Sequence, residues 1–229
     1  AQDHPEVTLD AQAIPPDGYR QRLSTVAAAN EMPDVFFVYA GSQSSELHQA
    51  KLLQPITEVL DAHSDWKDKF LPGAFDPYEF EEGQIYSAPL GMSATSILYY
   101  NKALFDKHNV KVPTTWEEMM AAVKTFNDNG ITPIALGNKA PWVAQSTIIG
   151  SIADRVTGTE WFKNAAAQQG AKFTDPEFIE ALGYFKELVD NKAFQEGANS
   201  IDNTQAEQYF IQGNAAMMIS GAWTLTNLA

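Results

Sequence analysis

Two tryptophans stand in loops that directly follow predicted strands. Trp142 comes after the predicted strand 134–137, and Trp223 follows the predicted strand 215–220. A flat indole in such a loop offers an apolar face on which a ligand with exposed C–H groups, such as a sugar ring, can stack. Packing in the core is the alternative role for each, and it is the role expected for the other three tryptophans. The two loop indoles are therefore predicted to belong to a binding site.

Short polar side chains occur in the same kind of loop. Three of them follow an early predicted strand and two precede Trp142; they are Ser42, Gln43 and Ser44, and Asn138 and Lys139, respectively. Ligands of open α/β sheets bind at the carboxyl ends of strands, so these residues are candidate hydrogen-bonding groups. The alternatives are that Ser44 only caps a helix and that the other side chains are only solvated.

Patterns that would indicate catalysis or a cofactor are missing. No Ser-His-Asp grouping, P-loop or dinucleotide-binding glycine run occurs. Acids adjacent in sequence could act as a glycosidase pair, but they fall in a predicted turn and at a helix start, where solvation and the helix dipole explain them; they are Asp76, Glu79, Glu81, Glu82, Glu117 and Glu118. The chain has no cysteine and four scattered histidines. We expect a protein that is not an enzyme and needs no metal or organic cofactor.

The first part of the chain alternates strand and helix patterns. Residues 7–14 alternate apolar and polar side chains and residues 35–39 form a short apolar run, both typical of strands. Between them, residues 19–30 have the apolar spacing of a helix. Strand, helix and strand in this order predict a βαβ unit and hence an α/β fold.

Turn and capping signals place the remaining elements. A hairpin turn is predicted at 81–84, followed by strands at 85–89 and 95–100. Asn101 and Thr115 are expected to cap helices, and Glu118 to complete a capping box with Thr115. The later part of the chain is mostly helical, with helices predicted at 142–157, 159–168, 176–190 and 203–212 and a last one opening at Gly221-Ala222-Trp223.

The change in composition predicts two lobes. The first, 1–109, is an α/β lobe with a crossing strand near 95–101, and the second, 110–229, is rich in helix. The 229 residues are 45% hydrophobic, enough for substantial cores. The formal charge of −14 disfavours nucleic acid and anionic lipid as partners. No apolar run is long enough to span a bilayer.

Six segments in order resemble the family-1 extracellular solute-binding proteins, the receptors of bacterial ABC importers for sugars. They are Met32-Pro33-Asp34-Val35, Leu52-Leu53-Gln54-Pro55-Ile56, Gly83-Gln84-Ile85-Tyr86-Ser87-Ala88-Pro89, Leu98-Tyr99-Tyr100-Asn101-Lys102-Ala103-Leu104-Phe105, Val112-Pro113-Thr114-Thr115-Trp116-Glu117-Glu118, and Phe210-Ile211-Gln212-Gly213-Asn214-Ala215-Ala216-Met217 running on to Gly221-Ala222-Trp223. Each segment is weak evidence by itself. Together they span essentially the whole chain.

The resemblance implies a two-lobed periplasmic-binding-protein-like fold of class II with a ligand cleft between the lobes. It implies a mono- or oligosaccharide ligand, with Trp223 as a stacking residue and Met92 and Ser93 passing the cleft, although Met92 is more simply explained as core filler. Partners would be the permease subunits of an ABC importer, and the full-length protein would be a monomer. The setting would be periplasmic or extracellular, where a lipid anchor is one way to hold the protein at the cell surface.

Measured against that family, the chain is expected to lack the first strand and helix of the first lobe and the C-terminal portion of the second. A truncated form, a proteolytic product and a chain completed by another chain all fit this expectation. We expect the piece to bind sugar weakly and to self-associate, because a missing central strand leaves backbone groups unpaired. Alternatives to sugar are another small solute, either a peptide or a polyamine, or, far less in keeping with the residues, catalysis on a carbohydrate.

Overall fold

The computed structural model describes residues 5–14, 16–91 and 93–228, and it divides into two compact units, Ala1–Met92 and Ser93–Ala229. The division comes earlier than the predicted boundary after residue 109. The segment 97–107 belongs to the second unit because its strand pairs with a strand near the end of the chain and Phe105 is buried in that unit's core.

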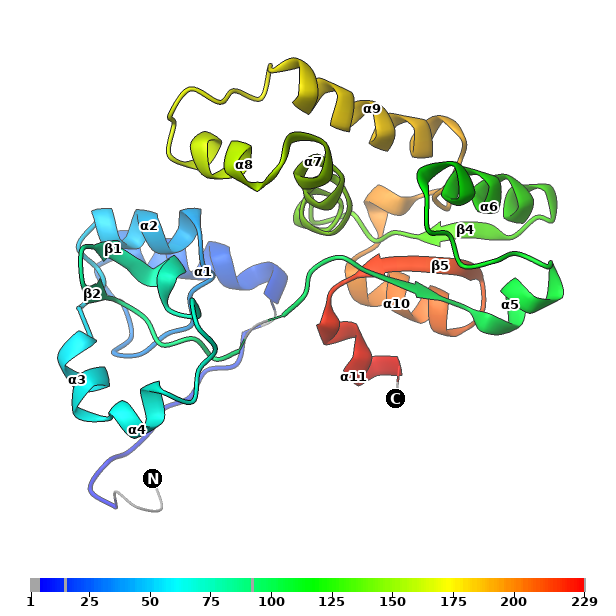
Figure 1. Ribbon diagram of the computed structural model, residues 1–229. Coiled ribbons are helices and arrows are strands. Elements are labelled where there is room, and N and C mark those ends of the chain that lie inside the picture. The colour runs from blue at the N-terminus through cyan, green and yellow to red at the C-terminus, as the bar shows by residue number, and fades with distance from the viewer. Residues whose placement is uncertain (1–4, 15, 92, 229) are drawn as a thin grey trace. The chain divides into compact units, whose positions relative to one another are not determined.

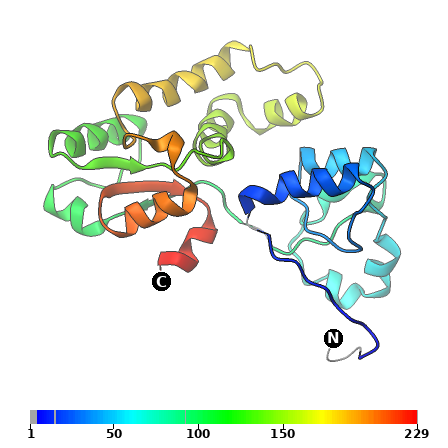
Figure 2. The same cartoon turned by 180° about the vertical axis from the view of Figure 1, so that it is seen from behind.

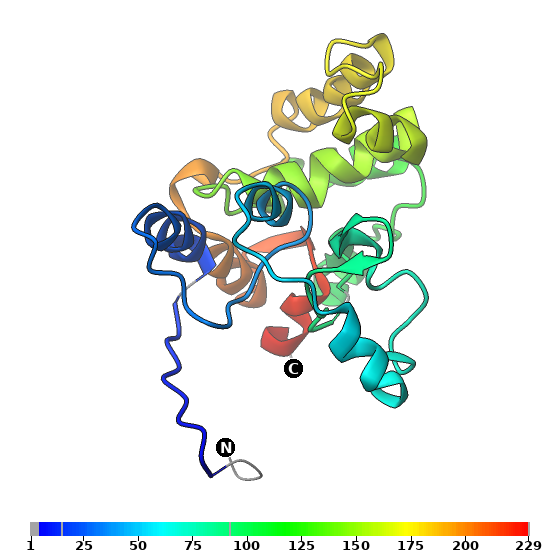
Figure 3. The same cartoon turned by 90° about the vertical axis from the view of Figure 1, so that its left-hand side faces the viewer.

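The first unit is a small helical body with one hairpin (Figures 1 and 3). Its elements are α1 (Pro16–Ala28), α2 (Ser42–Gln49), α3 (Thr57–Ala62), α4 (Ser64–Lys67), the 3-10 turn Asp76–Tyr78, β1 (Glu79–Glu81) and β2 (Gln84–Ile85). β1 and β2 pair antiparallel, which confirms the predicted hairpin, although the strand predicted at 85–89 is reduced to β2. Leu23, Val26, Val38 and Leu47 form the core. Helix α1 confirms the helix predicted at 19–30.

The strands predicted at 7–14 and 35–39 are not formed, so the predicted βαβ unit is wrong. Val35 is 89% exposed and Phe37 is 42% exposed, whereas Val38 is buried. The N–H of Tyr39 donates to Gln43 Oε1, 3.1 Å away, and not to a neighbouring strand. A buried parallel strand needs a partner for its backbone groups. Among the described residues of this unit, no segment pairs with 35–39, and the run remains an extended loop.

A mixed three-stranded sheet organises the second unit. Its order is β3 (Ile97–Tyr100), β5 (Ala215–Ser220), β4 (Thr132–Ala135), with β5 antiparallel to β3 and parallel to β4. Figures 1 and 2 show β5 between its two neighbours. Met217 in β5 faces Ile134 in register and is fully buried. A central strand covered on both faces is largely apolar, which is why the run at 215–219 followed by Ser220 is recognisable in the sequence.

Helices surround this sheet with the bounds that their caps impose. They are α5 (Lys102–Lys107), α6 (Trp116–Asp128), a π-helix (Ala144–Ile149) that continues into α7 (Gly150–Thr157), α8 (Thr159–Ala166), α9 (Pro176–Asp190), the 3-10 turn Ala198–Ser200, α10 (Asn203–Ile211), the 3-10 turn Ala222–Thr224 and α11 (Leu225–Leu228). Asn101 and Thr115 cap α5 and α6 as predicted. The hydroxyl of Thr115 accepts the N–H of Glu118, and the Glu118 carboxylate in turn accepts hydrogen bonds from the N–H and hydroxyl of Thr114.

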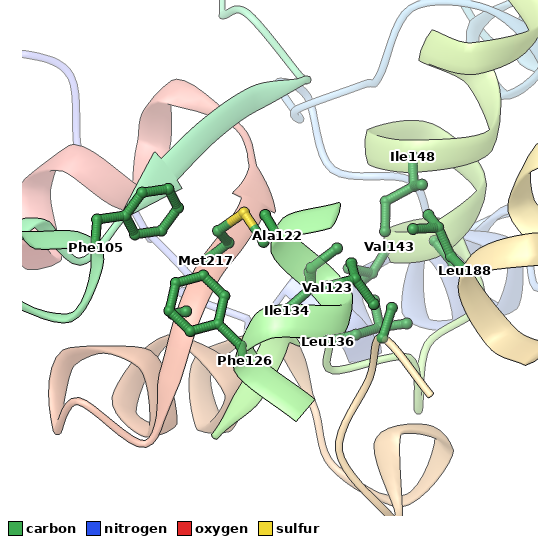
Figure 4. Packing of buried hydrophobic residues seen from close by; sticks show 13 residues of the cluster. Phe105, Ala122, Val123, Phe126, Ile134, Leu136, Val143, Ile148, Leu188 and Met217 are labelled. Atoms are coloured by element: carbon green, nitrogen blue, oxygen red, sulfur yellow. The ribbon is translucent and has the colours of Figure 1, made fainter. Parts of the chain in front are cut away.

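Two apolar layers lie on the two faces of the sheet. On one face, Phe126 of α6 packs with Phe105, Ile134 and Met217, and Figure 4 shows these side chains pointing toward one another. The rings of Phe105 and Phe126 have centroids 5.1 Å apart. On the other face, α10 contributes buried residues that pack with Ala135 and Met218. The alternation of side chains along β4 and β5 thus fixes α6 and α10 on opposite faces.

Candidate functional site

The second unit brings Trp142 and Trp223 together. Their ring centroids are 5.9 Å apart and the ring planes are inclined by 62°, an edge-to-face arrangement. Strands β4 and β5 are parallel, so the loops that follow them leave the same edge of the sheet. Trp142 is 38% exposed and Trp223 is half-buried. The pair thus offers apolar ring surface at the edge where a sheet of this type binds ligands.

The turn that carries Trp223 is held at its start. A Cβ added at Gly221 would lie 2.0 Å from Cζ3 of Trp223, so the ring packs directly over the glycine. The hydroxyl of Tyr99 donates to the carbonyl of Gly221 at 2.9 Å, and the N–H of Ala222 donates to the carbonyl of Ala94 at 2.8 Å. Burial, and next the nearby Glu207 carboxylate, raise the pKa of Tyr99, which keeps its hydroxyl a proton donor.

The loop before Trp142 is equally fixed. A Cβ at Gly137 would lie 2.1 Å from the carbonyl oxygen of Asp202, so only glycine allows this approach. Asn138 donates from Nδ2 to Asn199 at 2.9 Å and accepts the N–H of Ala144 on Oδ1 at 3.1 Å. The amide nitrogen and the amide oxygen of Asn138, a predicted binding residue, therefore both have partners within the protein. Its role as a direct ligand contact stays a prediction.

Lys139 and Ser93 are the exposed polar side chains predicted for this unit. The N–H of Lys139 donates to the carbonyl of Ile201 at 3.0 Å, which fixes its backbone and leaves the ammonium group in solvent. Ser93 precedes Ala94, whose carbonyl accepts from the Trp223 turn, so Ser93 lies next to that turn. Met92, predicted with Ser93, lies outside the described residues.

A buried carboxylate supports the Trp223 turn. Glu207 of α10 is 2% exposed. Its Oε1 accepts from the hydroxyl of Thr224 at 2.8 Å and from Nδ2 of Asn203 at 2.8 Å, and its Oε2 accepts from Nδ2 of Asn227 at 2.6 Å. The hydroxyl oxygens of Thr224 and Ser220 are 2.8 Å apart. Because the single hydroxyl proton of Thr224 is donated to Glu207, Ser220 is the donor in this second hydrogen bond.

The three residues predicted in the first unit lie at the start of α2. Ser42 is exposed. Gln43 is buried with its Oε1 on the N–H of Tyr39, and Ser44 is fully buried with its hydroxyl on the carbonyl of Gly41, 3.0 Å away. Ser42 is therefore the member of this group whose side chain is open to solvent. Ligand contact by the three stays a prediction.

The described residues contain no group of three or more His, Cys, Asp or Glu side chains placed to hold a metal ion. Within the same residues, no helix is both long enough and apolar enough to cross a bilayer. Two shallow, open hollows of the second unit, one along α10 and one beside the start of β4, are not lined by either tryptophan of the pair. Because both hollows are open, they would enclose little of a ligand. The Trp142–Trp223 pair therefore remains the candidate binding site.

Sequence reasoning missed the residues that support the two tryptophans. The sequence does not predict Tyr99, Gly221 or Glu207 as parts of the site. One signal was present for Glu207. On α10 it lies next to buried Ala206 and one turn before Phe210, so an acid occupies a position on the apolar face of a helix. Such a residue is buried only when hydrogen-bonding partners satisfy it.

The chain matches the family model described as "Bacterial extracellular solute-binding protein" over residues 1–228. A probable sugar-binding periplasmic protein of Rhizobium meliloti is 30% identical over 168 residues, which cover 71% of this chain and 38% of the relative. The xylose/arabinose-binding protein XacG of Haloferax volcanii is 24% identical over 97% of this chain and 48% of its own length. The chain thus spans about half the length, or less, of these curated relatives.

Solved structures show the same fold. One, from a study of xylan utilization by the thermophilic bacterium Caldanaerobius polysaccharolyticus, has a TM-score of 0.91 and 34% identity, covering 99% of this chain and 56% of the other. A chitin oligosaccharide binding protein has a TM-score of 0.88 at 24% identity, covering 98% of this chain and 56% of the other. These likenesses confirm the predicted fold class, that of a two-lobed solute-binding protein.

Proposed function

Because the chain belongs to the family of bacterial extracellular solute-binding proteins, we propose that this protein binds a neutral carbohydrate and delivers it to an ABC-type membrane importer. The binding surface is the Trp142–Trp223 pair, with Lys139 and Ser93 as hydrogen-bonding neighbours in the same unit. In the first unit, taken by itself, Ser42 is the residue that we propose for ligand contact, because its side chain is open to solvent. Gln43, Ser44 and Asn138 support their loops through the internal hydrogen bonds described above.

One observation carries this proposal: two partly exposed indoles meet edge to face, 5.9 Å apart, at the carboxyl ends of parallel strands. One ring can lie under the C–H face of a pyranose while the other forms a wall beside it, and hydroxyl groups at the rim then find polar partners. The names of several relatives include sugars, which is the second support. A cationic ligand would require exposed acids at this point, and Glu207, the carboxylate bonded to Thr224 and Asn227 of this segment, is buried.

We propose binding without catalysis. The acids that could form a glycosidase pair have structural roles: Glu79 accepts the N–H of Gly83 in the hairpin turn, and Glu81 lies 3.3 Å from His48. At the start of α6, the backbone N–H and hydroxyl of Thr114 lower the pKa of Glu118. A general acid on a sugar substrate needs the opposite shift of its pKa.

The proposal is tested by calorimetry of the chain with a xylo-oligosaccharide, raffinose and a chitin oligosaccharide, backed by ligand-observed NMR to detect weak binding. At least one sugar should bind, and Trp142→Ala and Trp223→Ala should each weaken binding about tenfold, the value of a lost stacking contact. Trp66→Ala is the matched control, since Trp66 is 41% exposed and lies in the first unit. Binding of spermidine or a peptide, with no response to any sugar, would replace the carbohydrate by one of those solutes.

A further inference from the structure

We propose that Glu207 is a positioning residue for Trp223, which deepens the proposed function and rests on it for its effect on ligand affinity. Its carboxylate is connected by hydrogen bonds to Thr224 and Asn227, on the segment that begins with Gly221 and carries the ring. Through these bonds it sets the orientation of Trp223 toward Trp142. It does not touch the ligand.

The hydrogen-bonding partners of Glu207 are unusual for a buried acid. None of the ion pairs between described residues includes Glu207; its three donors are a hydroxyl and two amides. Burial of a carboxylate without a cation is costly, and neutral donors on both oxygens offset only part of that cost. An apolar side chain of the same size would avoid that cost, but it would leave the hydroxyl and the two amide donors without this acceptor. Its contribution to the candidate site is to join α10 to the segment after Trp223 as a common acceptor.

That contribution is the fixed position of the turn. Thr224 immediately follows Trp223, and Asn227 lies one helical turn further along, so the two bonds fasten both sides of the short segment to α10. Hydrogen bonds to an ionised acceptor are short and directional, whereas apolar packing tolerates sliding. Without them, the hydroxyl of Thr224 keeps only Ser220 as a partner and Asn227 is released.

Two variants at position 207 separate hydrogen bonding from packing. Glu207→Leu fills the same space and offers no acceptor. Glu207→Gln keeps one acceptor oxygen for Thr224 and Asn203, and its amide can donate to Oδ1 of Asn227 once that side chain turns over. Gln208→Leu, at the exposed neighbouring position of α10, is the matched control for adding a leucine to this helix. Trp142→Phe defines the signal of a chain without the indole pair.

The readout is circular dichroism of the complete, ligand-free chain. Two indoles with centroids 5.9 Å apart couple their excited states and give a paired positive and negative band. We expect Glu207→Leu to lose this couplet, down to the level of Trp142→Phe, and to unfold at a lower temperature because three donors lose their acceptor. Glu207→Gln and Gln208→Leu should keep it. The affinity of Glu207→Leu for the sugar should fall about tenfold, as for a stacking ring that has lost its place.

Retention of the couplet in Glu207→Leu overturns the proposal, and so does its loss in Glu207→Gln to the same extent. If Glu207→Leu does not fold, the milder Thr224→Val/Asn227→Ala variant replaces it, and a couplet of full strength there is equally decisive against the idea. If the couplet behaves as expected but no sugar binds the unaltered chain, the positioning role stands and the proposed function fails. The two failures are therefore distinguishable.

Discussion

Gly221→Ala tests whether the ring of Trp223 is placed by its own turn. The added methyl group would lie 2.0 to 2.3 Å from Cζ3, Cη2 and Cε3 of the indole. The backbone at Gly221, with φ −88° and ψ 172°, is a conformation that alanine adopts without strain. The substitution therefore acts on the ring alone, and the hydrogen bond from Tyr99 to the Gly221 carbonyl has no reason to change.

The magnitude follows from the overlap. Carbon atoms in contact are normally about 3.5 to 4.0 Å apart, so the ring must move by roughly 1.5 Å or turn to another rotamer. Overpacking of this kind costs about 1 to 3 kcal/mol, and loss of the contact with Trp142 adds about 0.5 to 1.5 kcal/mol. Because Trp223 is half-buried and can relax toward solvent, we expect the lower part of that range, about 1 to 2 kcal/mol.

Urea unfolding gives the stability, and the tryptophan couplet gives the ring geometry. Gly183→Ala is the matched control: the site is in the interior of α9 with nothing within 4 Å of an added Cβ. That control should be stabilised by about 0.4 to 1 kcal/mol, because alanine restricts the unfolded chain. A Gly221→Ala variant with an unchanged couplet and the stability of the unaltered chain would refute the placement of the ring over Gly221.

Three further predictions concern the second unit. Thr115→Ala removes the cap of α6, and urea unfolding should show a loss of about 1 kcal/mol. Met217→Ala, at a fully buried position of β5, should cost about 2 to 5 kcal/mol in the same assay. Hydrogen bonds from the N–H of Lys172 and the indole of Trp161 lower the pKa of Asp175. Its ionised form therefore stabilises the fold above the ordinary pKa of about 3.9, and this stabilisation is lost as the pH falls through the lowered pKa. Thermal unfolding of Asp175→Asn should accordingly depend less on pH below about 5, and a pH profile parallel to that of the unaltered chain would contradict the role of these hydrogen bonds.

The second unit could be predicted closely because its signals are local. The bounds of α9 and β5 agree with the predicted ranges 176–190 and 215–220. A proline after Asp175 and a glycine after Ser220 delimit these elements within a few residues of sequence. The pattern inside each element then shows only which side faces the core.

The first unit could not be predicted in the same way, because a strand depends on its neighbours. The run at 35–39 has the composition of a buried strand, yet Val35 and Phe37 are exposed and the backbone is held by Tyr19 and Gln43 side chains. The composition shows only that the segment could form a strand if a neighbouring strand paired with it. Without a paired strand among the described residues, the same run is a loop.

The sequence predicts which two tryptophans belong to the candidate site. It does not predict how their rings are arranged, because that arrangement depends on α10. Both loops that carry a tryptophan contact the first turns of this helix or the residues just before it. Gly137 approaches the Asp202 carbonyl at the cap of α10, and Lys139 donates to Ile201 just before it. Glu207, one turn into the helix, holds the segment after Trp223. A displacement of α10 would therefore carry both rings with it and preserve the angle between them, whereas a change in either loop alone would alter that angle. The spacing of residues 142 and 223 in the sequence does not indicate that α10 supports both loops, because each of these contacts joins segments that are distant along the chain.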